Sequence, residues 1–226
     1  MAGKRKYDQG CAVAHGLDLV GERWALLVVR DLLLGAKRFT DLLVGLPGIS
    51  PDVLTQRLRD LTEAGVVHRR RLGPPTSSWV YELTPWGASL EPVVTGLALW
   101  ASRSPAMPYD APLGNDSLLI SLKVLFEPDA ATGLNATVAL HLGDEHFQIR
   151  IADGELEVAR GEAVEADTTL ETDQATLLTL LRTERPLDEA LAGGKLRLAG
   201  DRAVAERFRE LFPLPQPVRN ETTAFR

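Results

Sequence analysis

A proline-rich break near the middle of the chain limits the folds that this sequence can adopt. Residues 102–117, SRSPAMPYDAPLGNDS, hold three prolines, two aspartates and a glycine, which interrupt helical and strand periodicity alike. The 226 residues suffice for two domains of ordinary size. We therefore expect a first domain over residues 1–104, a linker over 105–116, a second domain over 117–212 and a polar, extended or disordered tail over 213–226.

The two halves carry opposite charge. Residues 1–104 hold 13 Lys and Arg against 10 Asp and Glu, whereas residues 105–226 hold 12 against 21. The first half is thus weakly basic and the second strongly acidic, although the whole chain has a net charge of −6. A polyanion would be tolerated by the first half and repelled by the second, so we expect two domains with different partners.

Several classes of protein are not indicated by the sequence. A single cysteine excludes a disulfide framework and a thiolate-rich zinc cluster. No stretch approaches the roughly 20 apolar residues that cross a bilayer, and the basic start MAGKRK lacks the apolar run of a secretion signal. We therefore expect a cytoplasmic protein without a membrane partner.

The first half reads as a series of helices. A short apolar stripe occupies residues 11–20, and residues 22–34 are apolar on nearly every side, with Gly35 as a stop signal. Thr40 is expected to cap a short helix that runs to Leu46, where Pro47 and Gly48 end it.

The best-marked helix covers residues 51–64. Ser50 is a good N-cap, Pro51 suits the first helical position, and Gly65 suits the left-handed position after the helix. Leu54, Leu58 and Leu61 repeat at four and three residues, which predicts one buried stripe. The opposite side then presents Asp52, Thr55, Gln56, Arg59 and Glu63.

A two-stranded ribbon should follow this helix. The strands VVHRRRL and WVYEL are separated by GPPTSS, which is typical of a tip. Thr84 and Pro85 then repeat the cap and proline signal of a helix that is expected to reach Ser102 with a kink at Pro92. Its apolar face would consist of Leu90, Val93, Val94, Leu97 and Trp100.

Helices followed by a ribbon with a basic base are in the order of a winged helix-turn-helix, in which one helix enters the DNA major groove and the ribbon lies along the backbone. Gln suits adenine edges, and Arg suits guanine edges or phosphates. Residues 69 and 71 should share one strand face and residue 70 the other, so at least one of these arginines is spared from phosphate contact. A simpler interpretation stays open, because a capped helix with outward polar residues is usually a solvated surface helix, and three arginines beside a turn often guard a sheet edge.

These residues also resemble a known family. The segment LDLVGERWALLVVRDLLLGAKRFTDLLVGLPGISPDVLTQRLRDLTEAGVVHRR and the later VYELTPWGASLEPVV resemble the HxlR-type transcriptional regulators, which belong to the MarR-like winged-helix proteins. The likeness covers about residues 8–102, with Ala12 in place of a frequent proline after Cys11. It implies a homodimer on palindromic double-stranded DNA, with dimer contacts from the first and last helices of the domain. The residues expected to contact DNA are Lys37, Arg38, Ser50, Thr55, Gln56, Arg59, Arg69, Arg70, Arg71, Ser77 and Ser78.

Cys11 is a candidate redox sensor, because several members of that family sense oxidants or electrophiles through a cysteine near this position. Such chemistry needs an exposed thiolate of lowered pKa, and Lys4, Arg5 and Lys6 are close in sequence. The alternative is that Cys11 is a small buried apolar residue at a dimer contact.

The second half predicts an α+β domain with an antiparallel sheet. We expect a helix over 117–131, strands in LNATVALHLG and in EHFQIRIADGELEVARG with a hairpin turn at Asp153-Gly154, and a strand in ADTTLETD. Helices in QATLLTLLRTE and RPLDEALAGG, the strand KLRLAG and a final helix capped by Asp201 complete the order.

This order, with Gly193-Gly194-Lys195-Leu196 and Gly200-Asp201, resembles the sterol carrier protein type 2 fold over about residues 117–212. Members enclose an apolar tunnel and carry lipids or acyl chains, which implies a hydrophobic effector here. The expected wall residues are Leu177, Leu178, Leu180, Leu181, Leu191, Phe208 and Phe212. Leucines at helical spacing are more often packed core, in which case the domain stabilises a dimer or repels DNA.

No catalytic, nucleotide or cofactor motif is present, so we expect no enzyme activity and no cofactor. His141 and His146 bracket a turn with Asp144 and Glu145, but nothing fixes a second shell and a metal site is not predicted. The sequence therefore predicts a cytoplasmic DNA-binding transcriptional regulator that acts as a dimeric repressor. Two alternatives stay open: a lipid-binding protein whose winged helix serves only dimerisation, and a regulator controlled by Cys11.

Overall fold

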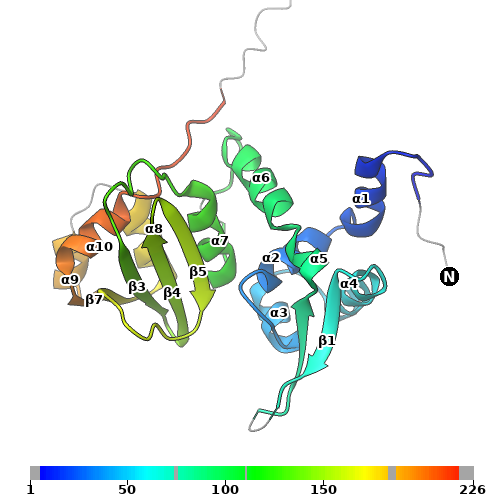
Figure 1. Ribbon diagram of the computed structural model, residues 1–226, viewed down its shortest axis with the longest axis horizontal. Helices are drawn as coiled ribbons and strands as arrows, with labels where there is room; N and C mark the ends of the chain where they lie inside the picture. Colours follow the sequence, from blue (N-terminus) through cyan, green and yellow to red (C-terminus); the bar gives the residue numbers. More distant parts are fainter. Residues whose placement is uncertain (1–5, 74–75, 110, 183–186, 219–226) are drawn as a thin grey trace, which may run out of the picture. The chain divides into compact units, whose positions relative to one another are not determined.

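The computed structural model describes residues 6–73, 76–109, 111–182 and 187–218. The chain divides into two compact units, residues 1–94 and 95–226 (Figure 1). This division falls inside one helix, α6 (Glu91–Ser102), whereas the sequence placed the end of the first domain at residue 104. The expected domain boundaries therefore stay a prediction, and each unit is described here by itself.

The first unit consists of helices followed by a ribbon. Its elements are α1 (Ala12–Val20), α2 (Ala25–Leu32), α3 (Phe39–Gly45), α4 (Pro51–Glu63), β1 (Val67–Arg71), β2 (Trp79–Leu83), α5 (Pro85–Ala88) and the start of α6. The core is formed by apolar side chains of α2, α3 and α4 and by the base of the ribbon. This arrangement is a winged helix-turn-helix, as the sequence predicted.

Two helix starts differ from the prediction. The helix expected over 22–34 begins only at Ala25, because Trp24 adopts the left-handed conformation with φ 77°. Thr40 is not an N-cap, since α3 already begins at Phe39 and the backbone N–H of Arg38 donates to the Asp41 carboxylate at 3.1 Å.

The single kinked helix expected after Thr84 is divided into α5 and α6. Ser89 and Leu90 form a turn between them, and Pro92 lies in the first turn of α6, where its missing N–H costs no hydrogen bond. Of the apolar face predicted for this segment, Val94 is buried, while Val93, Leu97 and Trp100 are exposed.

The second unit combines helices with one sheet. It contains α7 (Asn115–Leu125), β3 (Ala136–Leu142), β4 (Glu145–Ala152), β5 (Glu155–Arg160), β6 (Thr168–Thr172), α8 (Gln174–Arg182), α9 (Leu187–Ala192), β7 (Leu196–Gly200) and α10 (Arg202–Arg209). Helix α7 is shorter than the predicted helix over 117–131. Asp153 and Gly154 both have positive φ in the predicted hairpin turn.

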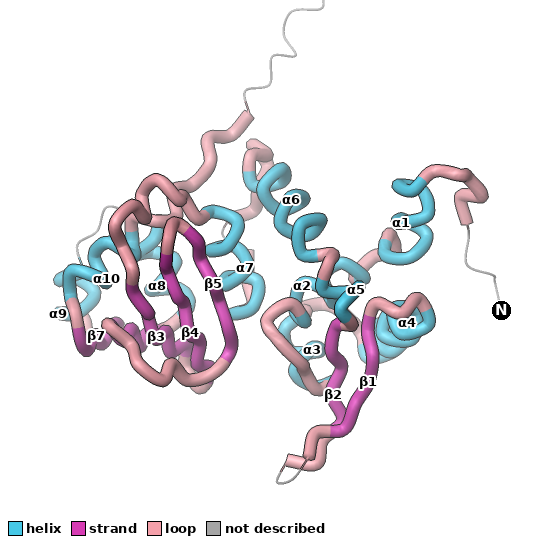
Figure 2. Tube along the Cα trace, viewed as in Figure 1, coloured by secondary structure: helices cyan, strands magenta, loops and turns pink. Residues whose placement is uncertain are grey.

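The strand order is β5-β4-β3-β6-β7, and the pair β3·β6 is parallel. The predicted antiparallel sheet is therefore corrected to a mostly antiparallel one. One face is buried: it carries Val138, Leu140, Phe147 and Ile149, and α7 and α10 pack against its strands. In Figures 1 and 2 the strands β3 and β4 lie in front of α8. The other face carries alternate, partly exposed residues, including His141 and His146.

Residues 213–218 after α10 have no helix or strand, and the Val218 N–H donates to the Arg103 carbonyl at 2.8 Å. The rest of the predicted tail lies outside the described residues. Among the residues that the structure describes, no helix combines the length and apolar character that crossing a bilayer requires.

Candidate nucleic-acid interface

Helix α4 presents one buried and one exposed side. Ser50 caps it, with its Oγ accepting the Val53 N–H at 3.3 Å. Leu54, Leu58 and Leu61 are at most 2% exposed, so the predicted stripe is confirmed. Gly65 follows with φ 73°, the left-handed conformation predicted for it. The opposite side of the helix is exposed at Asp52, Thr55, Gln56, Arg59 and Glu63.

The polar side chains on this exposed side are not equally free. Thr55 donates to the Pro51 carbonyl at 2.8 Å, and the Gln56 amide donates to the Asp60 carboxylate at 2.9 Å. Arg59 has no hydrogen bond or ion pair within the described part of the chain. Arg59 can therefore reach a base or a phosphate without breaking a contact, whereas Thr55 and Gln56 must first exchange theirs.

Arg57 on the same helix has a different position. Its guanidinium lies 3.2 Å from Asp60 and 3.5 Å from Glu22, and its side chain is 15% exposed. Arg57 thus joins α4 to the segment before α2, and its charge is compensated within the unit.

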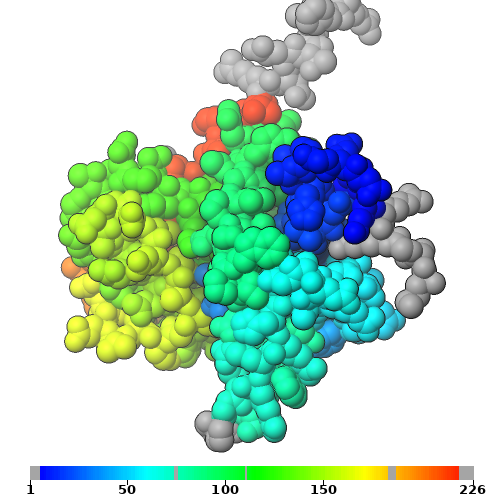
Figure 3. Space-filling view, turned by 45° about the vertical axis from the view of Figure 1, so that its right-hand side comes forward, coloured from blue at the N-terminus to red at the C-terminus, as the bar shows by residue number. Residues whose placement is uncertain are grey.

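The ribbon β1–β2 presents a basic, aromatic face. Arg69 pairs with Tyr81 and Arg71 with Trp79 in antiparallel register, so all four side chains share one face. The Arg69 guanidinium lies 4.5 Å above the Trp79 ring and 5.8 Å from Tyr81, which holds the extended arginine in place. Figure 3 shows the ribbon projecting as a narrow extension of its unit.

Arg70 lies on the other face of the ribbon. It forms an ion pair and a hydrogen bond with Glu82, and His68 lies 3.7 Å from the same carboxylate. The hydrogen bond raises the pKa of Arg70 and lowers the pKa of Glu82. The strand alternation thus separates Arg70 from Arg69 and Arg71, as the sequence indicated, and its charge is compensated.

The remaining residues predicted to contact DNA differ in how exposed they are. Lys37 is 7% exposed and its backbone pairs with Tyr81, so its ammonium lies inside the domain and cannot contact phosphate. This prediction is not supported, because the Lys37 side chain is buried within its own unit. Arg38 is exposed beside the start of α3. At the ribbon tip Ser77 is exposed with φ 41°, and Ser78 donates to the Thr76 carbonyl at 3.0 Å. The prolines of the tip, residues 74–75, lie outside the described residues.

Cys11 is exposed and immediately precedes α1. The backbone N–H groups of Ala14 and Val13 at the start of α1 lower the pKa of its thiol, which favours the reactive thiolate. The alternative, a cysteine that becomes buried at a dimer contact, stays a prediction. Of the basic residues expected to assist it, Lys6 is exposed, and Lys4 and Arg5 lie outside the described residues.

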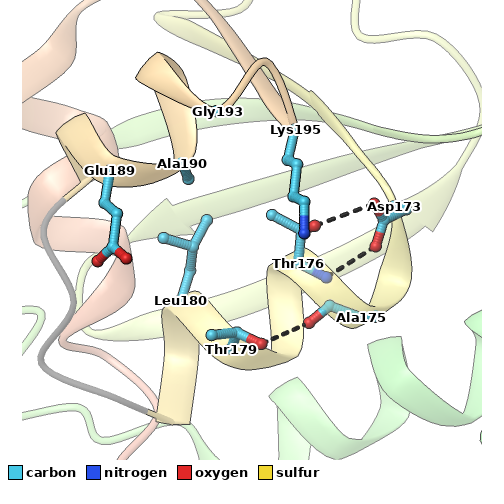
Figure 4. A pocket seen from close by; sticks show the side chains of 9 residues that line it. All are labelled: Asp173, Ala175, Thr176, Thr179, Leu180, Glu189, Ala190, Gly193 and Lys195. Carbon is cyan, nitrogen blue, oxygen red and sulfur yellow. Dashed lines mark hydrogen bonds between the residues drawn. The ribbon is translucent and has the colours of Figure 1, made fainter.

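The second unit contains a pocket between α8 and α9 (Figure 4), with a volume of about 550 Å³. Its lining is partly polar and consists of Asp173, Ala175, Thr176, Thr179, Leu180, Glu189, Ala190, Gly193 and Lys195.

Leu180 is the predicted wall residue found in this pocket. Leu177, Phe208 and Phe212 are at most 2% exposed, and the two phenylalanines pack edge to face at 5.1 Å. These three are core residues and do not line this pocket. Leu178, Leu181 and Leu191 are half-buried and are likewise not among its lining residues.

The fold and the exposed, arginine-bearing surface of the first unit define a winged helix-turn-helix protein. Comparison with known proteins agrees: residues 19–107 match the HxlR-like helix-turn-helix family, and residues 123–213 match the SCP-2 sterol transfer family. An uncharacterized HTH-type transcriptional regulator of Bacillus subtilis, YdeP, is 34% identical over 42% of this chain and 74% of its own. The chain therefore belongs to the HxlR-like helix-turn-helix family, and both resemblances seen in the sequence are confirmed.

Other relatives are similar to parts of the chain. The uncharacterized HTH-type transcriptional regulator Rv3095 of Mycobacterium tuberculosis is 34% identical over 46% of this chain and 66% of its own. Among solved structures, the redox regulator HypR in its oxidized form is 31% identical over 43% of this chain and all of its own, with a TM-score of 0.40. The sec-alkylsulfatase Pisa1 from Pseudomonas sp. is 23% identical over 48% of this chain, with a TM-score of 0.45. The match spans only 18% of that sulfatase.

Proposed function

We propose that this protein is a dimeric transcriptional repressor that reads a palindromic operator with α4 and holds the adjoining phosphates with the ribbon β1–β2. The observation that carries the proposal is the orientation of α4: its leucines are buried, and its opposite side is open at Arg59. The same unit offers Arg69 and Arg71 on a protruding ribbon. A helix in the major groove with a ribbon along the backbone needs these two surfaces.

The proposed contacts differ in kind. Arg59 contacts a guanine edge or a phosphate, and Thr55 and Gln56 contact base edges after giving up their bonds within the helix. Phosphates are held by Arg38, Ser50, Arg69, Arg71, Ser77 and Ser78. Arg70 adds little, because Glu82 compensates its charge, and Lys37 is left out because it is buried.

Titration of the protein into a labelled duplex from the region upstream of its own gene tests the proposal. We expect Arg59→Ala to weaken specific binding at least about fivefold, the low end of what a good arginine contact to a base contributes. Arg150→Ala is the matched control, because Arg150 is an exposed arginine of the acidic unit. If the wild-type protein binds no duplex even at low salt, the regulator is disproved and the lipid-binding alternative is favoured.

Dimerisation is supported by exposed apolar side chains. Helix α1 exposes Val13 and Leu17, and α6 exposes Val93, Leu97 and Trp100. Trp100 is 76% exposed in the single chain, which is costly for so large an apolar group. We propose that both helices are covered by a second copy of the chain, so that two α4 helices meet successive major grooves.

The pocket between α8 and α9 is the proposed place for an effector. The match to the SCP-2 family supports a hydrophobic ligand, and Leu180, Ala175 and Ala190 supply apolar wall. Asp173, Glu189 and Lys195 at the same pocket add charged groups, so the ligand would carry a polar end. Binding there needs to favour one dimer spacing by only about 1–3 kcal/mol to control DNA affinity.

A second candidate for the signal is oxidation of Cys11, favoured by the exposure of the thiol and its lowered pKa. We expect Cys11→Ser to keep the DNA affinity of the reduced wild type and to lose the change in affinity that peroxide causes. Cys11→Ala should behave in the same way. A peroxide response that persists in both variants removes Cys11 from the mechanism.

A further inference from the structure

Two histidines meet on the open face of the second unit's sheet. His141 of β3 and His146 of β4 are register partners across the hairpin, and their rings stack with centroids 4.1 Å apart at 25°. Their side chains are 24% and 36% exposed. The paired strands fix both Cα positions, so the two imidazoles are held together by the sheet itself.

A carboxylate completes the group. The Gly161 N–H donates to the His146 carbonyl at 2.9 Å, which continues the strand pairing and places Glu162 beside the histidines. The Glu162 carboxylate bonds to His146 Nδ1 and lies 3.5 Å from His141 Nε2. One ligand atom from each of the three residues falls within 4.8 Å of the others.

The carboxylate beside the histidines comes from a distant segment, whereas the neighbouring Glu145 points elsewhere. Glu145 alternates to the opposite face of β4, where it bonds to Asn115 and Arg160. Glu162 lies 16 residues beyond His146 in sequence and joins it only through the pairing of β4 with β5. The strand pairing thus supplies a third donor that short-range spacing could not reveal.

We propose that His141, His146 and Glu162 bind a first-row transition-metal dication of the Zn²⁺ type. Two imidazole nitrogens and one carboxylate oxygen form the ligand set typical of an open zinc site, with the fourth position left for water or an exogenous ligand. Metal bonds of 2.0–2.1 Å place tetrahedral ligand atoms roughly 3.3 Å apart. The three ligand atoms lie within 4.8 Å of one another, so modest side-chain rotations of the two imidazoles and the carboxylate would be needed to reach that separation.

The alternative is an ordinary surface cluster in which Glu162 contacts the two histidines and no metal binds. Contacts of this kind between partly exposed side chains contribute little stability, so they give no strong reason for the three side chains to stay together. A dication coordinated by both imidazoles and the carboxylate would hold all three side chains in one place. Bound metal would also join the strand pair β3–β4 to the segment after β5.

Titration calorimetry of ZnCl₂ into the full chain, after removal of metal with a chelator, tests the site. We expect one Zn²⁺ per chain, and binding at least about 100-fold weaker in Glu162→Gln and in His146→Gln, because loss of a direct ligand costs more than the roughly 10–100-fold lost with an outer-shell partner. Glu165→Gln is the matched control, because Glu165 is an exposed carboxylate of the same segment. Glu162→Gln keeps the size of an exposed side chain, so the fold should be unchanged by circular dichroism.

Cys11 and His15 at the start of α1 are the competing donors, since both are exposed and four residues apart. Cys11→Ser should leave Zn²⁺ binding unchanged. Co²⁺ in place of Zn²⁺ should give the strong visible absorption of a four-coordinate ion in the wild type and lose it in Glu162→Gln. The proposal is overturned by absence of binding, by equal affinity in Glu162→Gln, or by loss of binding in Cys11→Ser.

Discussion

At the scale of single residues, the arginines of the first unit show how partners decide a role. Arg57 is compensated by Asp60 and Glu22, and Arg70 by Glu82. Arg69 lies over two aromatic rings that leave its charge unneutralised. Chemically identical side chains therefore differ in whether their charge is available to a phosphate. Strand alternation places Arg70 on the opposite face from its sequence neighbours Arg69 and Arg71.

This difference predicts unequal effects of two neighbouring substitutions. Arg69→Ala should reduce the slope of log affinity against log salt by about 1, because one phosphate contact is lost. Arg70→Ala should leave the slope nearly unchanged. Fluorescence anisotropy with one duplex over a series of salt concentrations measures both. Equal slopes for the two variants would contradict the proposed orientation of the ribbon.

At the scale of elements, local signals were reliable where they satisfied backbone groups. Ser50 and Pro51 mark the start of α4 and Gly65 follows its end, as predicted. Asp201 caps α10, and its carboxylate accepts the Ala203 N–H at 2.7 Å. A helix start without such a signal was predicted less accurately: α2 was expected from residue 22 but begins at Ala25, after the left-handed Trp24. Hydrophobic periodicity continues through such a break because it records burial and not backbone conformation.

Gly87 in α5 is predicted to be essential for the packing of this element. A Cβ at Gly87 would lie 2.0 Å from the Val66 carbonyl oxygen, which backbone atoms cannot accommodate without a shift. We expect Gly87→Ala to lower the free energy of unfolding by more than about 2 kcal/mol. Gly96→Ala in α6 is the control, since its Cβ meets nothing within 4 Å, and helix propensity predicts a gain of up to about 1 kcal/mol. Urea unfolding monitored by circular dichroism compares them, and similar stabilities would disprove the close approach.

At the scale of the whole molecule, a weakly basic unit is joined to a strongly acidic one, and both α1 and α6 expose apolar side chains. The acidic unit disfavours non-specific contact with a polyanion, so the basic unit must supply the DNA affinity. The small basic excess also makes a dimer useful, because two copies double the number of phosphate contacts.

The exposed face of α6 predicts the oligomeric state. Trp100→Asp and Leu97→Asp should convert a dimer to a monomer at micromolar concentration, because a charge at a buried apolar contact is costly. Val164→Asp should leave the dimer unchanged, since Val164 is an apolar residue that is 95% exposed and lies outside the proposed interface helices α1 and α6. Sedimentation velocity distinguishes these outcomes. A wild-type monomer, or a dimer that persists in both α6 variants, would contradict the proposed interface.

The sequence by itself determined most of the order of helices and strands, the buried stripe of α4, the hairpin turn at Asp153-Gly154 and the family to which the chain belongs. These follow from local periodicity, capping and backbone conformation, which neighbouring residues specify. Only the tertiary structure decided that Lys37 is buried, that Arg70 is compensated by Glu82, that β3 and β6 are parallel and that Glu162 joins His141 and His146. Each of these depends on pairing between segments far apart in sequence, and the free energy of such a pairing is set by burial and geometry that no short stretch of residues contains.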